Sequence, residues 1–294
     1  MDNIRGISIM IAAMGFFAIE DMFIKQAARA MSTGQILAIL TLVAVPIFEL
    51  MARYQGKTMF DSTIFHKGVL TRNFFEMLGT LGFVTAITQT PLISATAIFQ
   101  ATPLVVTLGA ALFLGEKVRW RRWVAISVGF CGVMIIIRPG LEGFDPKSLW
   151  AVMAVIGLSG RDLATRRLPV GITNAQLAAW GFLVVGLLGA LMASVQGAWI
   201  MPTNQTMVWL VGASFCAIFG YWGITAAMRL GEISAIAPFR YVRLVFALII
   251  GIGVFSERPD AATYSGAALI ISSGIYSFWR ERQVKAKALA KLTK

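Results

Sequence analysis

The chain has 294 residues, of which 57% are hydrophobic and only 14% are charged, and its mean hydropathy is +0.75. Soluble domains carry roughly 25% charged residues, so this composition excludes an ordinary soluble protein and predicts an all-α integral membrane protein. The formal net charge of +12 would suit a nucleic-acid-binding protein. Most Lys and Arg, however, fall in loops and a tail expected on one side of a membrane, so we expect no nucleic-acid partner.

Ten apolar segments are long enough to cross the hydrocarbon core of a bilayer, about 30 Å thick, as helices. They are residues 4–27, 34–52, 68–89, 93–114, 121–137, 147–164, 174–196, 206–228, 234–255 and 261–280. The first is too long for a cleavable signal and has no small-residue cleavage site after it, so we expect it to remain as a helix. The placement of Lys and Arg predicts that both termini lie in the cytoplasm.

Charged residues occur inside the first and third segments. Glu20 and Asp21 are adjacent, about 100° apart around a helix, so only one can face the interior, and the sequence leaves open which. Arg72 and Glu76 are one turn apart, which permits an ion pair. Charge at membrane depth indicates a polar interior, although such pairs could merely neutralise one another near the membrane surface. The expected substrate-binding residues here are Arg72 and Asn73, and the expected coupling or gating residues are Glu20, Asp21 and Glu76.

Prolines interrupt the fourth and ninth segments. Pro103 follows Gln100 by three residues, and Pro238 holds a similar place in the ninth segment. Proline removes a backbone donor and frees a carbonyl one turn before it, so both are expected helix kinks. A kink can open a polar cavity or can serve packing alone. In the first case Gln100 would bind substrate.

The sixth and eighth segments carry further candidates. Arg161 and Asp162 lie near the end of the sixth and are assigned to coupling or gating. Tyr221 and Trp222 in the eighth could stack against a planar ring, although most aromatic residues in membrane proteins are packing residues or interface anchors.

The ninth segment contains Arg240, Tyr241 and Arg243. The two arginines share one helix face and are costly at membrane depth, so we expect them to face the interior or to extend to the interface. There they could bind a carboxylate, a phosphate or a ring carbonyl through forked hydrogen bonds. They could equally pair with acidic residues of neighbouring helices. Tyr241 is a candidate stacking residue beside them.

Other residues are expected to serve the architecture. Glu116 and Glu257 lie at helix ends and are expected to tie a loop to its neighbours. The expected interface anchors are Trp120, Trp123, Trp180 and Trp279. The small residues expected to allow close helix approach are Gly79, Gly82, Gly109, Gly129 and Gly132.

Polar positions recur between the two halves of the chain. The same offset separates Asp21 from Asp162 and Glu116 from Glu257, and SATAIFQATPLV (94–105) resembles SAIAPFRYVRLV (234–245). This predicts two five-helix repeats, residues 1–140 and 141–280, followed by a basic cytoplasmic tail, 281–294. Because five is odd, the second repeat would be inverted, which is typical of secondary transporters. A duplication could also simply build a stable bundle.

A family resemblance follows from the fourth and fifth segments. The stretch LISATAIFQATPLVVTLGAALFLGEKVRWRRWVAISVGFCGVMIIIRPG (92–140) resembles the EamA-like signature of the drug/metabolite transporter superfamily. The resemblance implies a ten-helix carrier in a bacterial inner membrane, with helices 1, 3, 4, 6, 8 and 9 around a central cavity. The second copy, at 231–257, departs from the pattern where Arg240, Tyr241 and Arg243 replace apolar or small residues.

Together these features predict a secondary active transporter rather than an enzyme. A balanced set of arginines and carboxylates suits a zwitterionic or planar aromatic metabolite, such as an amino acid or a riboflavin-like vitamin, and suits a polycation poorly. We expect alternating access between the halves, protons as the candidate coupling ion, and a monomer or homodimer in the bilayer. No Walker A motif occurs, and the scattered Cys131, Cys216 and His66 predict neither a cofactor nor a metal site. A membrane-embedded enzyme or a channel-like bundle is the alternative.

Overall fold

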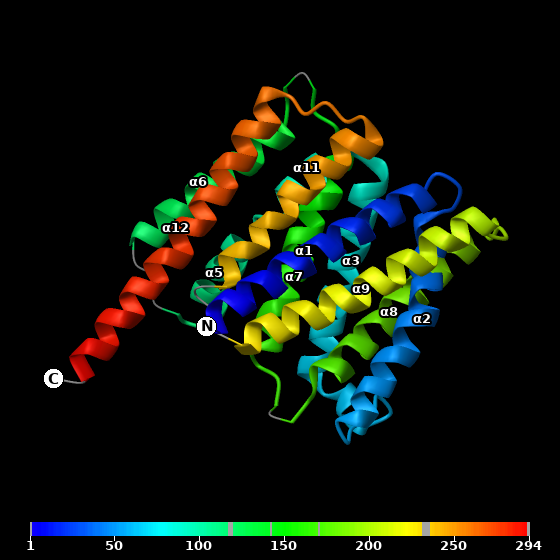
Figure 1. Cartoon of the computed structure of the whole chain (residues 1–294), viewed down its shortest axis with the longest axis horizontal. Helices are drawn as coiled ribbons and strands as arrows, with labels where there is room; N and C mark the ends of the chain where they lie inside the picture. The colour runs from blue at the N-terminus through cyan, green and yellow to red at the C-terminus, as the bar shows by residue number, and fades with distance from the viewer. Residues whose placement is uncertain (1, 117–119, 142, 170, 231–235, 293–294) are drawn as a thin grey trace. The chain divides into compact units, whose positions relative to one another are not determined.

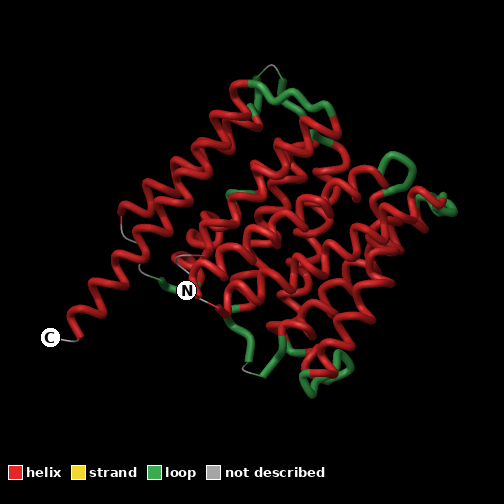
Figure 2. Tube along the Cα trace, viewed as in Figure 1, coloured by secondary structure: helices red, strands yellow, loops and turns green. Residues whose placement is uncertain are grey.

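The structure, a computed structural model, describes residues 2–116, 120–141, 143–169, 171–230 and 236–292. Within these ranges every regular element is helical and no strand occurs (Figures 1 and 2). The α-helices are α1 (Asp2–Ala27), α2 (Thr33–Tyr54), α3 (Lys67–Gln89), α4 (Leu92–Phe99), α5 (Thr102–Phe113), α6 (Trp120–Ile137), α7 (Leu149–Thr165), α8 (Asn174–Val195), α9 (Asn204–Leu230), α11 (Val242–Phe255) and α12 (Ala261–Leu292). Three short 3₁₀ helices are η1 (Ser62–Phe65), η2 (Pro146–Ser148) and η3 (Ala237–Tyr241).

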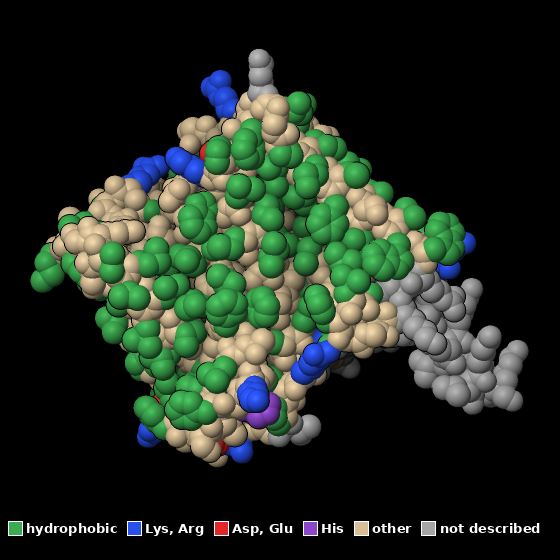
Figure 3. Space-filling view, turned by 180° about the vertical axis from the view of Figure 1, so that it is seen from behind, with side chains coloured by type: hydrophobic (Ala, Val, Ile, Leu, Met, Phe, Trp, Pro, Cys, Tyr) green, Lys and Arg blue, Asp and Glu red, His purple; other side chains and the backbone are tan. Residues whose placement is uncertain are grey.

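Among the residues that the structure describes, six helical stretches are long and apolar enough to cross a membrane. They are Ile4–Ala27, Thr33–Tyr54, Leu92–Phe113, Asn174–Val195, Asn204–Met228 and Ala237–Phe255, and Trp123–Ile137 is a shorter apolar helix. Large hydrophobic side chains lie exposed on many of these helices, and Figure 3 shows them spread over one face of the molecule. Exposed apolar surface of this extent is expected where the solvent is lipid. The protein is therefore a multi-pass membrane protein, and the expected count of ten spans stays a prediction.

The expected fourth and ninth spans are both interrupted near their prolines. The fourth is divided into α4 and α5, which meet at Gln100 and Ala101, and Pro103 lies in the first turn of α5. A first-turn position suits proline because its missing N–H has no partner within the helix there. In the ninth span, Pro238 lies in η3, directly before α11.

The helices form two compact units. The first unit comprises 1–18, 91–148 and 219–294, and the second comprises 19–90 and 149–218. Each unit takes helices from both expected repeats, so the compact units do not coincide with the halves of the sequence. The inverted repeat itself stays a prediction.

Close helix contacts build the second unit, where α3 packs on α7 and α2 packs on α8. A Cβ atom at Gly157 of α7 would lie 2.3 Å from the backbone nitrogen of Gly79 in α3. Between α2 and α8, a Cβ at Gly189 would lie 2.5 Å from the carbonyl oxygen of Gly34. Only glycine permits helix backbones to approach this closely, and the absence of a hydrophobic driving force in lipid makes such contact important.

The position of Trp180 corrects one expectation. It was expected to anchor at the membrane interface, but its side chain is fully buried in the second unit. Its Nε1 donates a 2.7 Å hydrogen bond to the carbonyl oxygen of Met59 in the loop after α2. A tryptophan in the first third of a helix looks like an interface residue in sequence, but here a loop folds back over it and accepts its N–H.

In the first unit, two acidic residues near the turn between α11 and α12 hold the segments around it. The Glu257 carboxylate accepts hydrogen bonds from the backbone nitrogens of Leu92 and Ile93, at 2.6 and 3.0 Å. This caps the first turn of α4 and confirms that Glu257 ties a loop to its neighbour. Asp260 precedes α12, accepts from the backbone nitrogen and hydroxyl of Thr263, and pairs with Arg138.

The interactions of Asp260 predict that part of the free energy of unfolding is lost in acid. The hydrogen bonds from Arg138 and from the Thr263 N–H lower the pKa of this carboxyl to about 2. A lowered folded-state pKa stabilises the fold above the unfolded pKa of about 4, and this contribution is lost as the pH falls toward 2. We expect the melting temperature of Asp260→Asn to fall less than that of the wild type between pH 5 and pH 3. Asp260→Ala, which also removes the cap, should lose about 1 kcal/mol more than Asp260→Asn at neutral pH. Equal pH slopes for wild type and Asp260→Asn would contradict this role.

Candidate functional site

A network of four charged side chains joins α3 and α7 in the second unit. On α3, Arg72 Nη2 lies 2.7 Å from Glu76 Oε2, as their spacing of one turn predicts. On α7, Arg161 Nη1 lies 3.3 Å from Glu76 Oε1, and its Nη2 lies 2.8 Å from Asp162 Oδ1. Glu76 therefore accepts from two arginines, and the four charges sum to zero.

One end of this network is enclosed and the other is open. The side chains of Arg72 and Glu76 are only 8% and 13% exposed, whereas those of Arg161 and Asp162 are 30% and 35% exposed. Burial of a charge is costly unless it is paired and hydrogen-bonded, so the enclosed end is the part most dependent on its partners. The open end, Arg161 with Asp162, is the part that a solute could reach.

Hydrogen bonds fix the enclosed end from two helices. Arg72 Nη1 donates to the carbonyl oxygen of Leu177 in α8 at 2.8 Å and to Asn73 Oδ1 at 3.0 Å. The hydroxyl of Thr80 donates to Glu76 at 3.2 Å. A Cβ atom at Gly181 would lie 2.9 Å from Arg72 Nη1, so this glycine leaves the room that the guanidinium occupies. Arg72 and Asn73, both expected to bind substrate, are buried here, where Arg72 pairs with Glu76 and Asn73 accepts a hydrogen bond from Arg72.

The structure separates the two acidic residues near the end of α1. Asp21 is 1% exposed and Glu20 is half-buried, so Asp21 is the one that faces the packed interior. One turn later, Lys25 Nζ donates to the carbonyl oxygens of Ile87 and Thr90, at 3.0 and 2.6 Å. These carbonyls lie at the C-terminal end of α3, where a cation is favourable. A coupling or gating role for either acid stays a prediction.

A second cluster surrounds Arg243 in the first unit. The guanidinium carbon of Arg243 lies 5.2 Å from the ring centroid of Phe17 and 5.4 Å from that of Phe99. Arg243 is half-buried on α11, so this cation is placed against two aromatic rings within a helix long enough to span a membrane. The side chain thus presents hydrogen-bond donors beside an aromatic surface.

The break at Gln100 and the turn of η3 are joined in the same unit. Gln100 Nε2 donates to the carbonyl oxygen of Arg240 at 3.2 Å. Both residues lie where a regular helix is interrupted, so a side-chain amide satisfies a carbonyl that the interruption affects. Arg240 is itself half-buried. This bond keeps the two interrupted segments in register beside Arg243.

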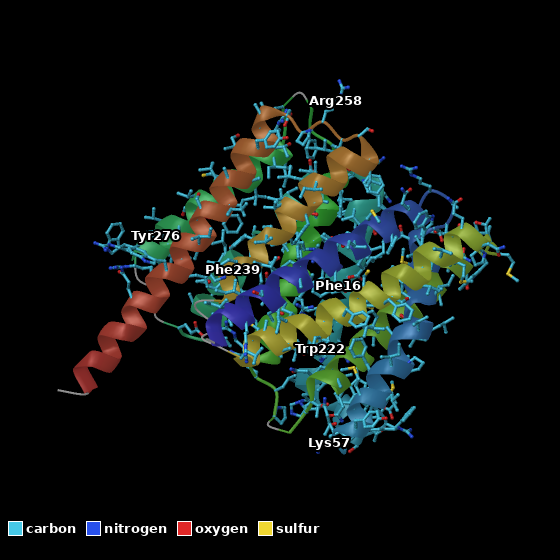
Figure 4. The ribbon with its side chains drawn as sticks, viewed as in Figure 1. Phe16, Lys57, Trp222, Phe239, Arg258 and Tyr276 are labelled. Atoms are coloured by element: carbon cyan, nitrogen blue, oxygen red, sulfur yellow. The ribbon has the colours of Figure 1, made fainter. Side chains whose placement is uncertain are left out.

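The aromatic candidates divide by exposure. Tyr241 is buried, and a Cβ atom at Gly274 of α12 would lie 1.7 Å from its hydroxyl oxygen, so this tyrosine packs directly on a glycine of α12. Trp222 is 57% exposed on α9 (Figure 4), and Phe219, one turn earlier, is also exposed. The exposed side chains of Phe219 and Trp222 favour contact with lipid. Tyr221 is half-buried between these extremes.

Sequence reasoning missed several members of these clusters. Phe17 carries no polar signal and looks like an ordinary lipid-facing residue until α11 places Arg243 against it. Phe99 adjoins Gln100 in the repeated SAT segment and could have been suspected from that position. The Leu177 carbonyl has no sequence signal, because any residue supplies a backbone oxygen.

Comparison with known proteins places these features in context. The model of the EamA-like transporter family matches residues 4–138. A riboflavin transporter of Vibrio cholerae is 30% identical over 207 residues, which cover 69% of this chain and 68% of the relative. An S-adenosylmethionine uptake transporter of Rickettsia bellii is 27% identical over 222 residues, 75% of each chain. The pseudopaline exporter CntI of Pseudomonas aeruginosa is 24% identical over 272 residues, 90% of this chain and 93% of that one.

A solved crystal structure supports the fold alone. It is 16% identical, covers 93% of this chain and 97% of its own, and superposes with a TM-score of 0.61.

Proposed function

Because this chain belongs to the EamA-like transporter family, we propose that it moves a zwitterionic or planar aromatic metabolite across the bacterial inner membrane by alternating access. Its family and its relatives are transporters, so it is a small-metabolite transporter and not an enzyme. Two of these relatives are named as transporters of riboflavin and of S-adenosylmethionine. Riboflavin has a planar ring system and S-adenosylmethionine has an amino-acid zwitterion, and both compound classes support the proposal.

The observation that carries the substrate class is the placement of Arg243 against Phe17 and Phe99. A flat guanidinium offers forked donors to a carboxylate or a ring carbonyl, and the neighbouring rings offer a surface for stacking. A polycation would meet a like charge at this point. A planar compound with an electron-rich edge would instead satisfy both parts of the cluster.

The network around Glu76 is our candidate for coupling. A proton on Glu76 would remove the negative charge shared by Arg72 and Arg161, and Arg161 would keep its pairing with Asp162. Such a change weakens the link between α3 and α7, which supports Glu76 and Asp162 as sites of proton-linked gating. The cytoplasmic placement of both termini, inferred from Lys and Arg, and the choice between monomer and homodimer belong to the same proposal.

The test is ligand binding followed by counterflow. Purified protein is melted with amino acids, S-adenosylmethionine, riboflavin, nucleobases, organic anions or polyamines, because a ligand of the native state raises the melting temperature. Arg243→Lys keeps the charge but loses the fork, so the ligand concentration that gives the same shift should rise about tenfold. Arg5→Lys, on an exposed arginine of the same unit, is the matched control.

Counterflow in proteoliposomes then separates a carrier from a channel-like bundle. A carrier that alternates access accumulates labelled substrate against unlabelled substrate inside, and this flux saturates, whereas a channel gives neither result. An imposed pH gradient that leaves the flux unchanged would remove protons from the proposal. Stabilisation by polyamines that Arg243→Lys does not alter would overturn the substrate class.

A further inference from the structure

Helices α6 and α12 approach each other closely at two facing glycines. They pack side by side (Figure 1). A Cβ atom at Gly132 would lie 2.6 Å from the carbonyl oxygen of Gly266, and a Cβ at Gly266 would lie 2.6 Å from that of Gly132. Nearer the start of α6, a Cβ atom at Gly129 would lie 2.8 Å from Ser273 Oγ, besides its contact with Leu104, so α6 and α12 run antiparallel.

A cavity of about 390 Å³, open to the surroundings on one side, lies along α6 and α12. Its volume falls within the range of about 300–1,000 Å³ typical of small-ligand sites. Val124, Ala125 and Val128 supply an apolar wall, and Trp120, Arg121 and Tyr276 lie at its polar end. Figure 4 labels Tyr276 on α12. The cavity is therefore amphipathic, with apolar side chains along one wall and the Arg121 cation at one end.

The polar end has the composition of a membrane interface. The guanidinium carbon of Arg121 lies 5.4 Å from the ring centroid of Trp120, and the rings of Tyr276 and Trp279 lie 6.1 Å apart. Trp120 and Trp279 are both exposed. Tryptophan and tyrosine favour the headgroup level of a bilayer. The sequence of α12 beyond this point is rich in Lys and Arg, which attract anionic lipid.

We propose that the α6–α12 cavity binds a phospholipid with an anionic headgroup, whose acyl chain lies along Val124 and Val128 and whose phosphate pairs with Arg121. The charge decides between a lipid and a second copy of this chain. Two copies with the same orientation in a membrane would bring two of these basic ends together, and like charges oppose that contact. An anionic lipid matches both the apolar wall and the cation. This site lies apart from the Arg243 cluster and does not depend on the proposed substrate.

Native mass spectrometry of the full chain tests the proposal with two lipids of identical acyl chains, phosphatidylglycerol and phosphatidylcholine. The wild type should retain phosphatidylglycerol in preference. Arg121→Gln should weaken phosphatidylglycerol binding about fivefold and weaken phosphatidylcholine binding less, because the choline cation already balances that phosphate. Val128→Phe places a larger side chain in the cavity beside its apolar wall, so it should weaken the binding of both lipids. Arg5→Gln removes an equal charge elsewhere in the unit and should change neither.

Three results would overturn the site. The first is equal retention of the two lipids by the wild type, or equal effects of Arg121→Gln and Arg5→Gln. The second is competition by free glycerol phosphate as strong as that by the lipid, which would assign the cavity to a soluble phosphate compound. The third is a shift from dimer to monomer in Val128→Phe with unchanged lipid retention, which would make this face an interface between copies. If the Val128→Phe variant melts below the working temperature, the comparison of phosphatidylglycerol retention between Arg121→Gln and Arg5→Gln decides whether the site exists.

Discussion

Replacing Glu76 by alanine is expected to lower the free energy of unfolding by about 3–5 kcal/mol, because it removes the carboxylate that accepts from both Arg72 and Arg161. Arg72 is the more affected of the two, since its side chain is only 8% exposed whereas that of Arg161 is 30% exposed. Unfolding by SDS titration in mixed micelles measures the loss. Arg72→Met combined with Glu76→Leu should cost less than Glu76→Ala, because the enclosed guanidinium of Arg72 is removed together with the carboxylate it pairs with.

The chain offers a matched control for burial. Arg53 and Glu49 form another pair one turn apart, also at 2.7 Å, but the Arg53 side chain is 63% exposed. Arg53→Ala should therefore cost less than about 1 kcal/mol, whereas Arg72→Ala should cost several times more. Similar losses for the two arginines would show that burial does not set the strength of the Arg72–Glu76 pair.

This comparison also shows what could be predicted from the sequence. Helix type and the Arg72–Glu76 pair follow from local rules, because a spacing of one turn places both groups on one face. The junction with Arg161 does not follow, because it depends on how closely α3 approaches α7. Hydropathy places a helix in the membrane but says nothing about which helix it contacts.

The same reasoning explains the error at Trp180 and the absence of Phe17 from the expected site. Both are aromatic residues in apolar segments, and sequence assigns such residues by their distance from the segment ends. In the structure Trp180 donates to the carbonyl of Met59, and Phe17 lies against Arg243. Each role is set by a residue far away in the chain, so it becomes visible only when the partner is placed.

Gly157 controls the approach on which the Glu76 network depends. A Cβ atom there would lie 2.3 Å from the backbone nitrogen and 2.5 Å from the Cα of Gly79. Backbone atoms cannot rotate away as a side chain can, so α7 would have to move from α3 as a whole. Arg161 lies one turn further along α7 and contacts Glu76 at 3.3 Å. Separation of the helices would therefore lengthen this ion pair as well.

We expect Gly157→Ala to lower the free energy of unfolding by about 2–3 kcal/mol, the cost of overpacking at a site that cannot relax locally. The same SDS titration applies, and Gly253→Ala is the control. Gly253 lies within α11 with no atom within 4 Å of its Cβ position, so alanine there should be neutral or should stabilise by up to about 1 kcal/mol. Because Gly157→Ala also draws Arg161 from Glu76, adding Arg161→Gln to it should cost less than Arg161→Gln alone. Fully additive losses would mean that the glycine contact and the ion network are independent.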